Sequence, residues 1–355
     1  MERASVEFLQ KLCDARSPSG FEEDAAKIWQ ERTKEFVDEI RTDVHGNSIA
    51  VLNKDGKPRV MLAGHIDEIG YMVKYIDDKG FIFFRPIGGI DRHLVPGERV
   101  WIKTKEGIIT GAIGRKPIHA MDEKEREKLL KFHQMWVDIG AKDKETARKL
   151  VKIGDPAVPA VKFEELREDR VIGRGFDDKS GAFVVSETLR LLASRKISAS
   201  VYGVATVQEE IGLRGAKTSA FGIHPDIGIA IDVTLATDYP AMEESKKMIG
   251  EIKVGGGPVI SRGPNINPKV FDLLIETAEE LKIPYQIEAQ ERGTPTDANV
   301  IQLTREGIAT GLVSIPTRYI HTPVELLSLN DLENTAKLLA EFIVRLAPDI
   351  QLVPF

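Results

Sequence analysis

The residues of this chain that could do chemistry are two histidines and a set of acids, which stand beside glycines or just after apolar runs. They are His65, Asp67, Asp177, Asp178, Glu209, Glu210, Asp232 and His321. Imidazoles and carboxylates without a cysteine thiolate form a nitrogen and oxygen ligand set that suits zinc, cobalt or manganese. Three carboxylates and two imidazoles are enough for two ions. We therefore expect a site for two divalent ions per subunit, zinc or cobalt.

In a two-ion site the ions stand about 3.5–4 Å apart and share a bridging carboxylate. Asp177 is the candidate for the bridge, because it lies in a glycine-flanked loop that opens a helical pattern. Adjacent residues that leave a strand point in opposite directions. One of Glu209 and Glu210 can therefore bind metal while the other faces substrate as a general base. Asp67, two residues after His65, points to the same face and can orient the imidazole ring through its second nitrogen.

Four apolar segments must bring these side chains together. They are residues 59–64, 201–207, 227–231 and 311–315, each too apolar for a surface edge. The site residues follow directly, except that His321 comes after a short polar connection. Ligand sites in open α/β sheets lie beyond the carboxyl ends of the strands, so the four endings meet if the strands are parallel neighbours. Helical patterns at 180–195 and 269–281 complete an α/β fold with a largely parallel mixed sheet flanked by helices.

The sequence pattern between about residue 67 and residue 173 differs from that of the rest of the chain. Short β-rich segments at 71–76, 81–87, 99–103 and 108–113 are separated by turn signals, and charged helical patterns follow at 122–133 and 144–152. This indicates a small β-rich domain, residues 68–164, inserted into a discontinuous catalytic domain made of residues 1–67 and 165–355.

Composition excludes several classes of function. The formal net charge of -6 comes from 55 acidic and 49 basic residues with no basic block, so a nucleic acid is not an expected partner. No apolar run approaches the roughly 18 residues of a membrane span, and no secretion signal opens the chain. Cys13 is the only cysteine, which excludes an internal disulfide, and it lies on an apolar helical stripe. We expect a cytoplasmic protein in which Cys13 packs in the core.

Five motifs in this order resemble the TET-type (tetrahedral) metalloaminopeptidases, the glutamyl or deblocking aminopeptidases among the co-catalytic zinc peptidases. The resemblance covers essentially the whole chain. The strings are Ala-Gly-His65-Ile-Asp67-Glu-Ile-Gly, Gly-Phe-Asp177-Asp178-Lys-Ser-Gly, Val-Gln-Glu209-Glu210-Ile-Gly, Ala-Ile-Asp232-Val-Thr and Tyr-Ile-His321-Thr-Pro. Any one of them is weak evidence, whereas all five in order are highly specific.

The resemblance implies a role for each site residue. One ion is held by His65, Asp177 and Asp232, and the other by Asp177, Glu210 and His321. Glu209 is the general base, Asp67 orients His65, and a cis peptide bond joins Asp177 to Asp178.

The resemblance also implies a substrate pocket and an assembly. Arg292, Gly293 and Thr294 match the family's Gly-Thr-Asp-Ala region beside the substrate, although an extra Thr-Pro departs from that pattern. The inserted domain resembles the family's PDZ-like dimerisation domain, whose dimers assemble into a hollow tetrahedral dodecamer.

The expected function is removal of N-terminal residues from peptides, with Glu209 taking a proton from a water between the ions. A related two-metal amide hydrolase, a deacylase or carboxypeptidase, uses the same ligand set but does not require a free amine. A third hypothesis is a non-catalytic scaffold protein. The presence of every expected ligand together with the expected general base argues against this hypothesis.

Overall fold

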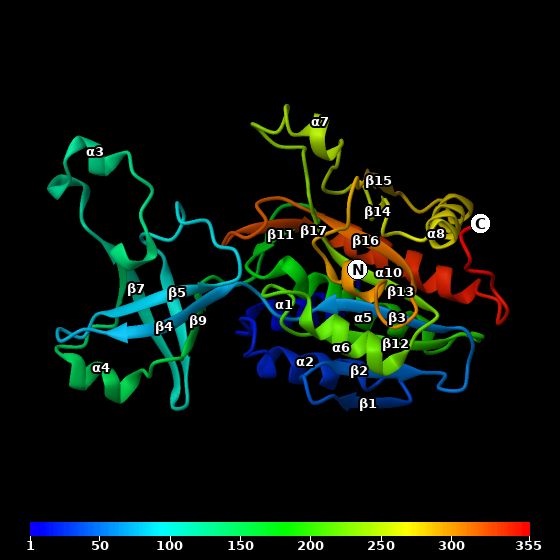
Figure 1. Ribbon diagram of the computed structural model, residues 1–355, viewed down its shortest axis with the longest axis horizontal. Helices are drawn as coiled ribbons and strands as arrows, with labels where there is room; N and C mark the ends of the chain where they lie inside the picture. Colours follow the sequence, from blue (N-terminus) through cyan, green and yellow to red (C-terminus); the bar gives the residue numbers. More distant parts are fainter.

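The computed structural model describes residues 1–355 and has two lobes. Figure 1 shows the smaller lobe, built from strands between β4 and β9 with α3 and α4, standing apart from the larger lobe that holds both chain ends. The larger lobe is built on an eight-stranded sheet with the order β1-β2-β12-β3-β13-β16-β14-β15. None of the helices combines the length and the apolar composition that a membrane crossing requires.

The four predicted apolar strands are neighbours in the middle of the large sheet. They are β12 (Ser200–Thr206), β3 (Arg59–His65), β13 (Ile227–Leu235) and β16 (Ala309–Thr317), and adjacent members run parallel. The register pairs His65 with Thr206 and Asp232 with Ser314. The prediction of parallel neighbours is confirmed, and the polar endings of these strands reach the same edge of the sheet.

The outer strands reverse direction on both sides of this parallel centre. On one side, β1 (Glu39–Thr42) and β2 (Ser48–Leu52) are antiparallel to each other, and β2 is antiparallel to β12. On the other side, β14 (Val259–Arg262) is antiparallel to β16 and parallel to the edge strand β15 (Gln286–Ala289). The sheet is therefore mixed, as expected.

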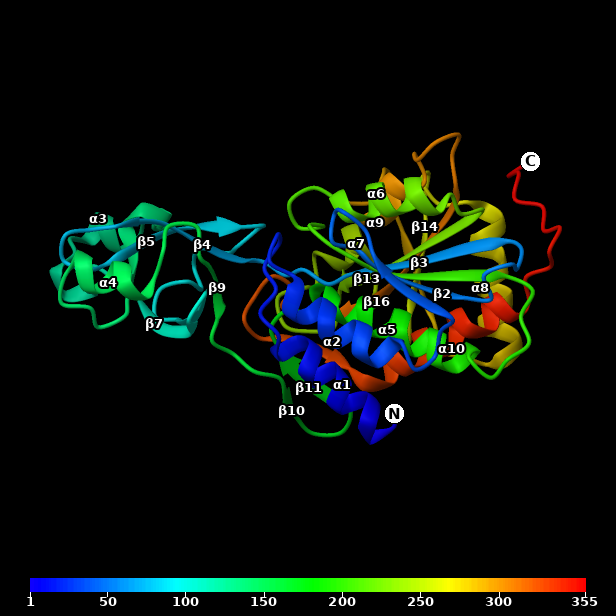
Figure 2. The ribbon, with the colours of Figure 1, turned by 90° about the horizontal axis from the view of Figure 1, so that it is seen from below.

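Helices cover both faces of the sheet (Figure 2). On one face α5 (Phe176–Leu192) packs against β3, β12 and β13, and α1 (Arg3–Asp14), α2 (Glu23–Thr33) and α10 (Leu329–Val344) pack around it. The opposite face carries α6 (Arg214–Ile223) and α9 (Asp297–Ile301). The remaining helices of this lobe are α7 (Lys246–Ile249) and α8 (Pro268–Leu281).

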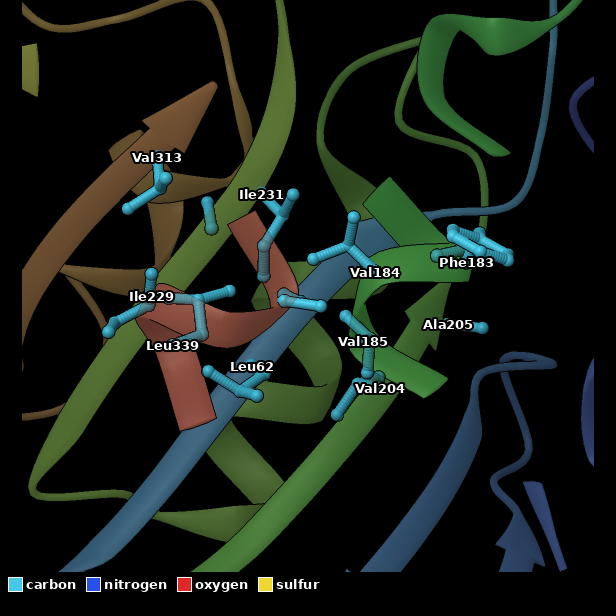
Figure 3. Packing of buried hydrophobic residues seen from close by; sticks show 14 of the residues in the cluster. Leu62, Phe183, Val184, Val185, Val204, Ala205, Ile229, Ile231, Val313 and Leu339 are labelled. Atoms are coloured by element: carbon cyan, nitrogen blue, oxygen red, sulfur yellow. The ribbon is translucent and has the colours of Figure 1, made fainter. Parts of the chain in front are cut away.

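The main core lies between the sheet and α5. Leu62 and Ile229, which pair across β3 and β13, face α5, and Figure 3 shows them with Val184 and Val185 of that helix. Val204 of β12 follows Gly203, which faces Val185, and therefore points to the opposite side of the sheet. All five side chains are buried, because helices cover both faces of the central strands and because α5 is enclosed by the sheet and by the helices around it. Because this core fixes β3 against α5, it also fixes the two motifs at their ends. Cys13 is buried in the same cluster, as predicted.

The small lobe is a closed barrel with its own hydrophobic core. Its strands are β4 (Gly70–Ile76), β5 (Ile82–Ile87), β6 (Arg99–Thr104), β7 (Gly107–Arg115), β8 (Met135–Asp138) and β9 (Pro156–Pro159). The first four match the predicted β segments, whereas β8 and β9 were not predicted because four-residue strands carry little alternation. The boundaries 68 and 164 and the likeness to a PDZ domain stay predictions.

The helical segment expected at 122–133 was mostly wrong. Only α3 (Glu123–Arg126) is α-helical, and a 3-10 turn follows at Phe132–Gln134, after another 3-10 turn at Ile118–Ala120. Most of this stretch is exposed, and its contact with the barrel core comes from Leu130 and Phe132 near its end, so little apolar surface is buried that could stabilise a longer helix. The second expected helix forms as α4 (Lys144–Leu150).

A three-stranded sheet links the barrel to the start of α5. It consists of β10 (Glu164–Glu165), β11 (Arg170–Gly173) and β17 (Glu325–Ser328), all antiparallel. The register places Glu325 opposite Gly173, just before α5 begins. Glu325 is thereby brought to the edge where the four central strands end.

Candidate metal centre

Asp177 lies between the two predicted histidine ligands. Its Oδ1 is 3.1 Å from His65 Nε2, and its Oδ2 is 3.1 Å from His321 Nε2. One carboxylate thus presents a different oxygen to each ring, the arrangement that a bridging ligand needs. The Asp177–Asp178 peptide bond is cis, as the resemblance implied.

The adjacent acids Glu209 and Glu210 face different histidines. Glu209 Oε2 is 3.7 Å from His65 Nε2, whereas Glu210 Oε2 is 3.5 Å from His321 Nε2. The preceding residue, Gln208, has a left-handed φ of 56° that turns the chain sharply after β12. The buried Glu22 carboxylate accepts a hydrogen bond from Gln208 N at 3.1 Å and so holds this turn.

Asp67 supports both the His65 ring and the turn that carries the two glutamates. Its carboxylate accepts hydrogen bonds from Glu209 N at 3.0 Å and from Glu210 N at 3.1 Å, and Ser19 Oγ donates a third at 2.6 Å. His65 Nδ1 lies 3.2 Å from the Asp67 carbonyl and 3.5 Å from its carboxylate. The contact with Nδ1 leaves Nε2 free to face Asp177.

Asp178 holds the end of β3 against the start of α5. Its carboxylate accepts hydrogen bonds from His65 N at 3.1 Å and from Gly181 N at 2.9 Å. This approach requires glycine, because a Cβ on Gly64 would lie 2.4 Å from the Gly181 carbonyl carbon. At Gly175, a left-handed φ of 66° begins α5. The glycines of both motifs therefore serve the close contact between them.

Glu325 was not predicted as a site residue. It is 2% exposed, and its two oxygens accept hydrogen bonds from Asp177 N at 3.2 Å and His321 N at 3.0 Å. His321 itself has a left-handed φ of 62°, which this bond stabilises. The only sequence signal was an acid four residues after His321, too common a pattern to single out.

Burial, together with an excess of acids over the two histidines, raises several acidic pKa values at the site. Burial, with repulsion from Asp232, raises the pKa of Glu209 to about 10. Burial and the Asp177 charge raise the pKa of Asp232 to about 8. Burial would lower the pKa of His321, but Asp177 and Glu210 raise it to about 9. The cluster has a deficit of positive charge that added cations would fill.

The donor atoms fit divalent ions. Two groups have ligand atoms within 4.8 Å of one another, namely His65, Asp177, Glu210 and His65, Asp178, Asp232. Ligands around one tetrahedral zinc ion stand about 3.4 Å apart, given bonds of about 2.0–2.1 Å, close to the 3.1–3.7 Å contacts described above. In addition, Glu210 Oε1 is buried without a hydrogen-bond partner, which is costly unless a ligand satisfies it.

A cavity of about 650 Å³ opens beside these side chains, and its lining includes both glutamates, Asp177, Asp232 and both histidines. Arg292, Gly293 and Thr294 also line it, together with the extra Pro295. Thr294 is buried and accepts a hydrogen bond from Asn265 at 2.9 Å. The Arg292 side chain is 84% exposed and is therefore at the rim of the cavity.

The chain is similar in sequence to known aminopeptidases. Residues 46–338 match the family M42 glutamyl aminopeptidase. The chain is 37% identical over 345 residues to a lysyl aminopeptidase of Pyrococcus furiosus, with 96% of this chain and 97% of the relative covered.

Two solved structures share the whole fold. A TET aminopeptidase from a marine sediment archaeon of the Thaumarchaeota superposes with a TM-score of 0.92 at 36% identity, covering 97% of this chain and 96% of that one. The Pyrococcus horikoshii TET1 peptidase, which can assemble into a tetrahedron or a large octahedral shell, gives a TM-score of 0.86 at 33% identity, covering 96% and 100%.

Proposed function

The chain belongs to the M42 glutamyl aminopeptidase family and is an aminopeptidase, and from this premise we propose that it works with two divalent ions. The family is metal-dependent, and the residues at the edge of the sheet fit the requirement. His65, Asp177 and Asp232 would hold one ion, and Asp177, Glu210 and His321 the other. The observation that carries this proposal is the placement of one Asp177 oxygen against each histidine.

Zinc or cobalt ions bound here would polarise the scissile carbonyl and lower the pKa of water to near neutrality. Glu209 is the proposed general base, because its carboxylate lines the cavity and contacts His65 without being needed to hold either ion. Positive charge at the site would lower its raised pKa and leave it ionised. Glu209 would then take a proton from the attacking water and deliver it to the leaving amine.

The other residues of the site would position these groups. Asp67 would orient His65 and hold the backbone of Glu209, so that the base keeps a fixed distance from the histidine. Arg292, Gly293 and Thr294 would contact the peptide, since they line the cavity beside the acids. The name of the family refers to glutamate and the name of a relative to lysine, so neither fixes the N-terminal preference of this chain.

The test uses metal-stripped protein titrated with zinc or cobalt, and pairs of short peptides that differ only in N-terminal acetylation. We expect metal-dependent release of the first residue from the free peptides alone. Cleavage of the acetylated peptides would instead favour the hypothesis that the protein is a deacylase. The Glu209→Gln variant should keep its metal content and lose peptide turnover, and full turnover in this variant would exclude Glu209 as the base.

We also propose that subunits associate through the barrel lobe into dimers and then into a tetrahedral dodecamer. This proposal is supported by the assemblies of the Pyrococcus horikoshii relative and by the position of the barrel, which stands away from the catalytic lobe (Figure 1). Light scattering on purified protein should report a dodecamer of 39.4 kDa subunits. The cytoplasmic location stays a prediction from the sequence.

A further inference from the structure

The wall of the substrate cavity contains an acid that none of the five motifs includes. Glu288 lies on the edge strand β15 and lines the cavity beside Thr234 and Asp232 of β13. It is 6% exposed. Its two carboxylate oxygens both lie 3.1 Å from Thr234 Oγ1, which donates the hydrogen bond.

The orientation of β15 is the reverse of what burial of apolar surface favours. Successive strand residues point to opposite faces, so either Ile287 or Glu288 must face inward. Ile287 is 49% exposed, whereas Glu288 is buried. A shift of one residue in the register of β15 would bury Ile287 and expose Glu288, but the strand keeps the register that buries the acid. An acid kept inside at the cost of an exposed isoleucine is typical of a functional position rather than a packing one.

Glu288 also has no partner of opposite charge in the chain. It takes part in none of the ion pairs, and the hydrogen bond from Thr234 comes from a neutral group. The other charged residues of this side of the cavity, Glu291 and Arg292, are 80% and 84% exposed and lie 3.7 Å from each other. A buried carboxylate is costly unless a cation pairs with it. The missing cation can come from the substrate.

The distance from the proposed metal ligands suits a long basic side chain. Asp232 and Thr234 share a face of β13, about 6.6 Å apart at about 3.3 Å per residue. Glu288 contacts Thr234 directly. An extended lysine side chain spans about 6 Å from Cα to Nζ. A residue held beside Asp232 with such a side chain can therefore bring its ammonium group to the Glu288 carboxylate.

We propose that Glu288 selects peptides whose N-terminal residue is lysine or arginine. The inference rests on the proposed aminopeptidase activity and adds the class of substrate. An N-terminal glutamate is disfavoured, because its carboxylate would be placed against Glu288 in a buried wall. Thr234 is a positioning residue here, since its hydroxyl fixes the orientation of the carboxylate.

The test compares Lys-Ala and norleucine-Ala dipeptides, whose first side chains share the same four carbons but differ in the ε-ammonium group. We expect wild-type kcat/KM for the lysine peptide to exceed that for the norleucine peptide at least tenfold. In Glu288→Gln, kcat/KM for the lysine peptide should fall about 10- to 100-fold, the value of a hydrogen bond between charged groups, while the norleucine peptide changes less than about threefold. Glu291→Gln removes an exposed acid at the rim of the same cavity and should leave the ratio unchanged.

The wild-type comparison needs no variant, so it remains informative if Glu288→Gln does not fold. Equal rates on the two dipeptides, or faster cleavage of Glu-Ala, would overturn the proposal. An equal loss on both dipeptides in Glu288→Gln would also overturn it, because the side chain would then serve a general role. Failure to cleave any free peptide at full metal occupancy would instead refute the aminopeptidase function on which the inference rests.

Discussion

The Glu325→Gln substitution tests whether the metal centre depends on acids that do not themselves bind metal. Both oxygens of Glu325 accept backbone hydrogen bonds, from Asp177 and from His321. Glutamine keeps the size of the side chain but offers one oxygen and one amide group, so one of the two N–H groups loses its acceptor and faces another donor. A hydrogen bond to a charged group contributes about 1.5–3 kcal/mol. The loop that loses its bond relaxes, and ion binding must restore its position.

The expected result is a zinc affinity about 10- to 150-fold weaker than that of the wild type, which is the same free energy expressed as a ratio. Stripped protein is titrated with zinc in competition with a chelator of known affinity. Glu164→Gln is the matched control, because Glu164 is exposed on β10 of the same small sheet and makes no side-chain hydrogen bond. Thermal unfolding of the stripped proteins verifies that both variants fold. Wild-type affinity in Glu325→Gln would refute the reasoning.

Three further predictions concern metal content, packing and pH. His321→Ala should lower the metal content from two ions per subunit to one, measured by elemental analysis, and retention of two ions would contradict the proposed ligand set. Gly64→Ala places a Cβ 2.4 Å from the Gly181 backbone and should lower the free energy of unfolding in urea by more than about 1–3 kcal/mol, unlike Gly222→Ala in α6, where the space is open and the backbone is helical. Burial raises the pKa of Asp331 from 3.8 to about 6 in the folded state, so the folded chain binds the proton more tightly and wild-type stability falls as pH rises from about 4 to 6. The urea stability of Asp331→Asn relative to wild type should therefore improve across that range, and a constant difference would contradict the assignment.

The sequence predicted which side chains gather at one edge of the sheet, because these residues follow apolar strands or lie in a glycine-rich loop. His65 is the last residue of β3, Asp232 lies in β13, and Asp177 is in the first turn of α5. The hydrophobic periodicity and the composition of these segments were therefore enough to place the three side chains at one edge of the sheet. The same reasoning left open which of Glu209 and Glu210 binds metal. The structure places Glu210 nearer His321 and Glu209 nearer His65, which is consistent with the roles implied by the resemblance.

What the sequence could not predict depends on contacts between distant segments. Glu325 reaches the site because β17 pairs with β11, and Glu288 reaches the cavity because β15 turns its acid inward. The alternation of apolar and polar residues does not reveal which strand a four-residue strand pairs with. It also does not reveal which face of β15 points inward, because an isoleucine and a glutamate are adjacent and either could be buried. The short strands β8 and β9 escaped prediction for the same reason.

Three acids that hold the backbone of the proposed ligands explain why the site keeps its shape. Asp67, Asp178 and Glu325 each accept two backbone hydrogen bonds, and in each case the donors include a proposed ligand or its neighbour in the turn. These carboxylates fix the backbone, so little conformational freedom remains to be lost when ions bind. They also add buried negative charge, which makes the cluster costly without cations and strengthens its attraction for them. Because the unfolded chain has no such cluster, ion binding should stabilise the fold as well as enable catalysis. A metal-dependent rise in melting temperature that is smaller in Glu325→Gln than in Glu164→Gln would link the two effects to the same hydrogen bonds.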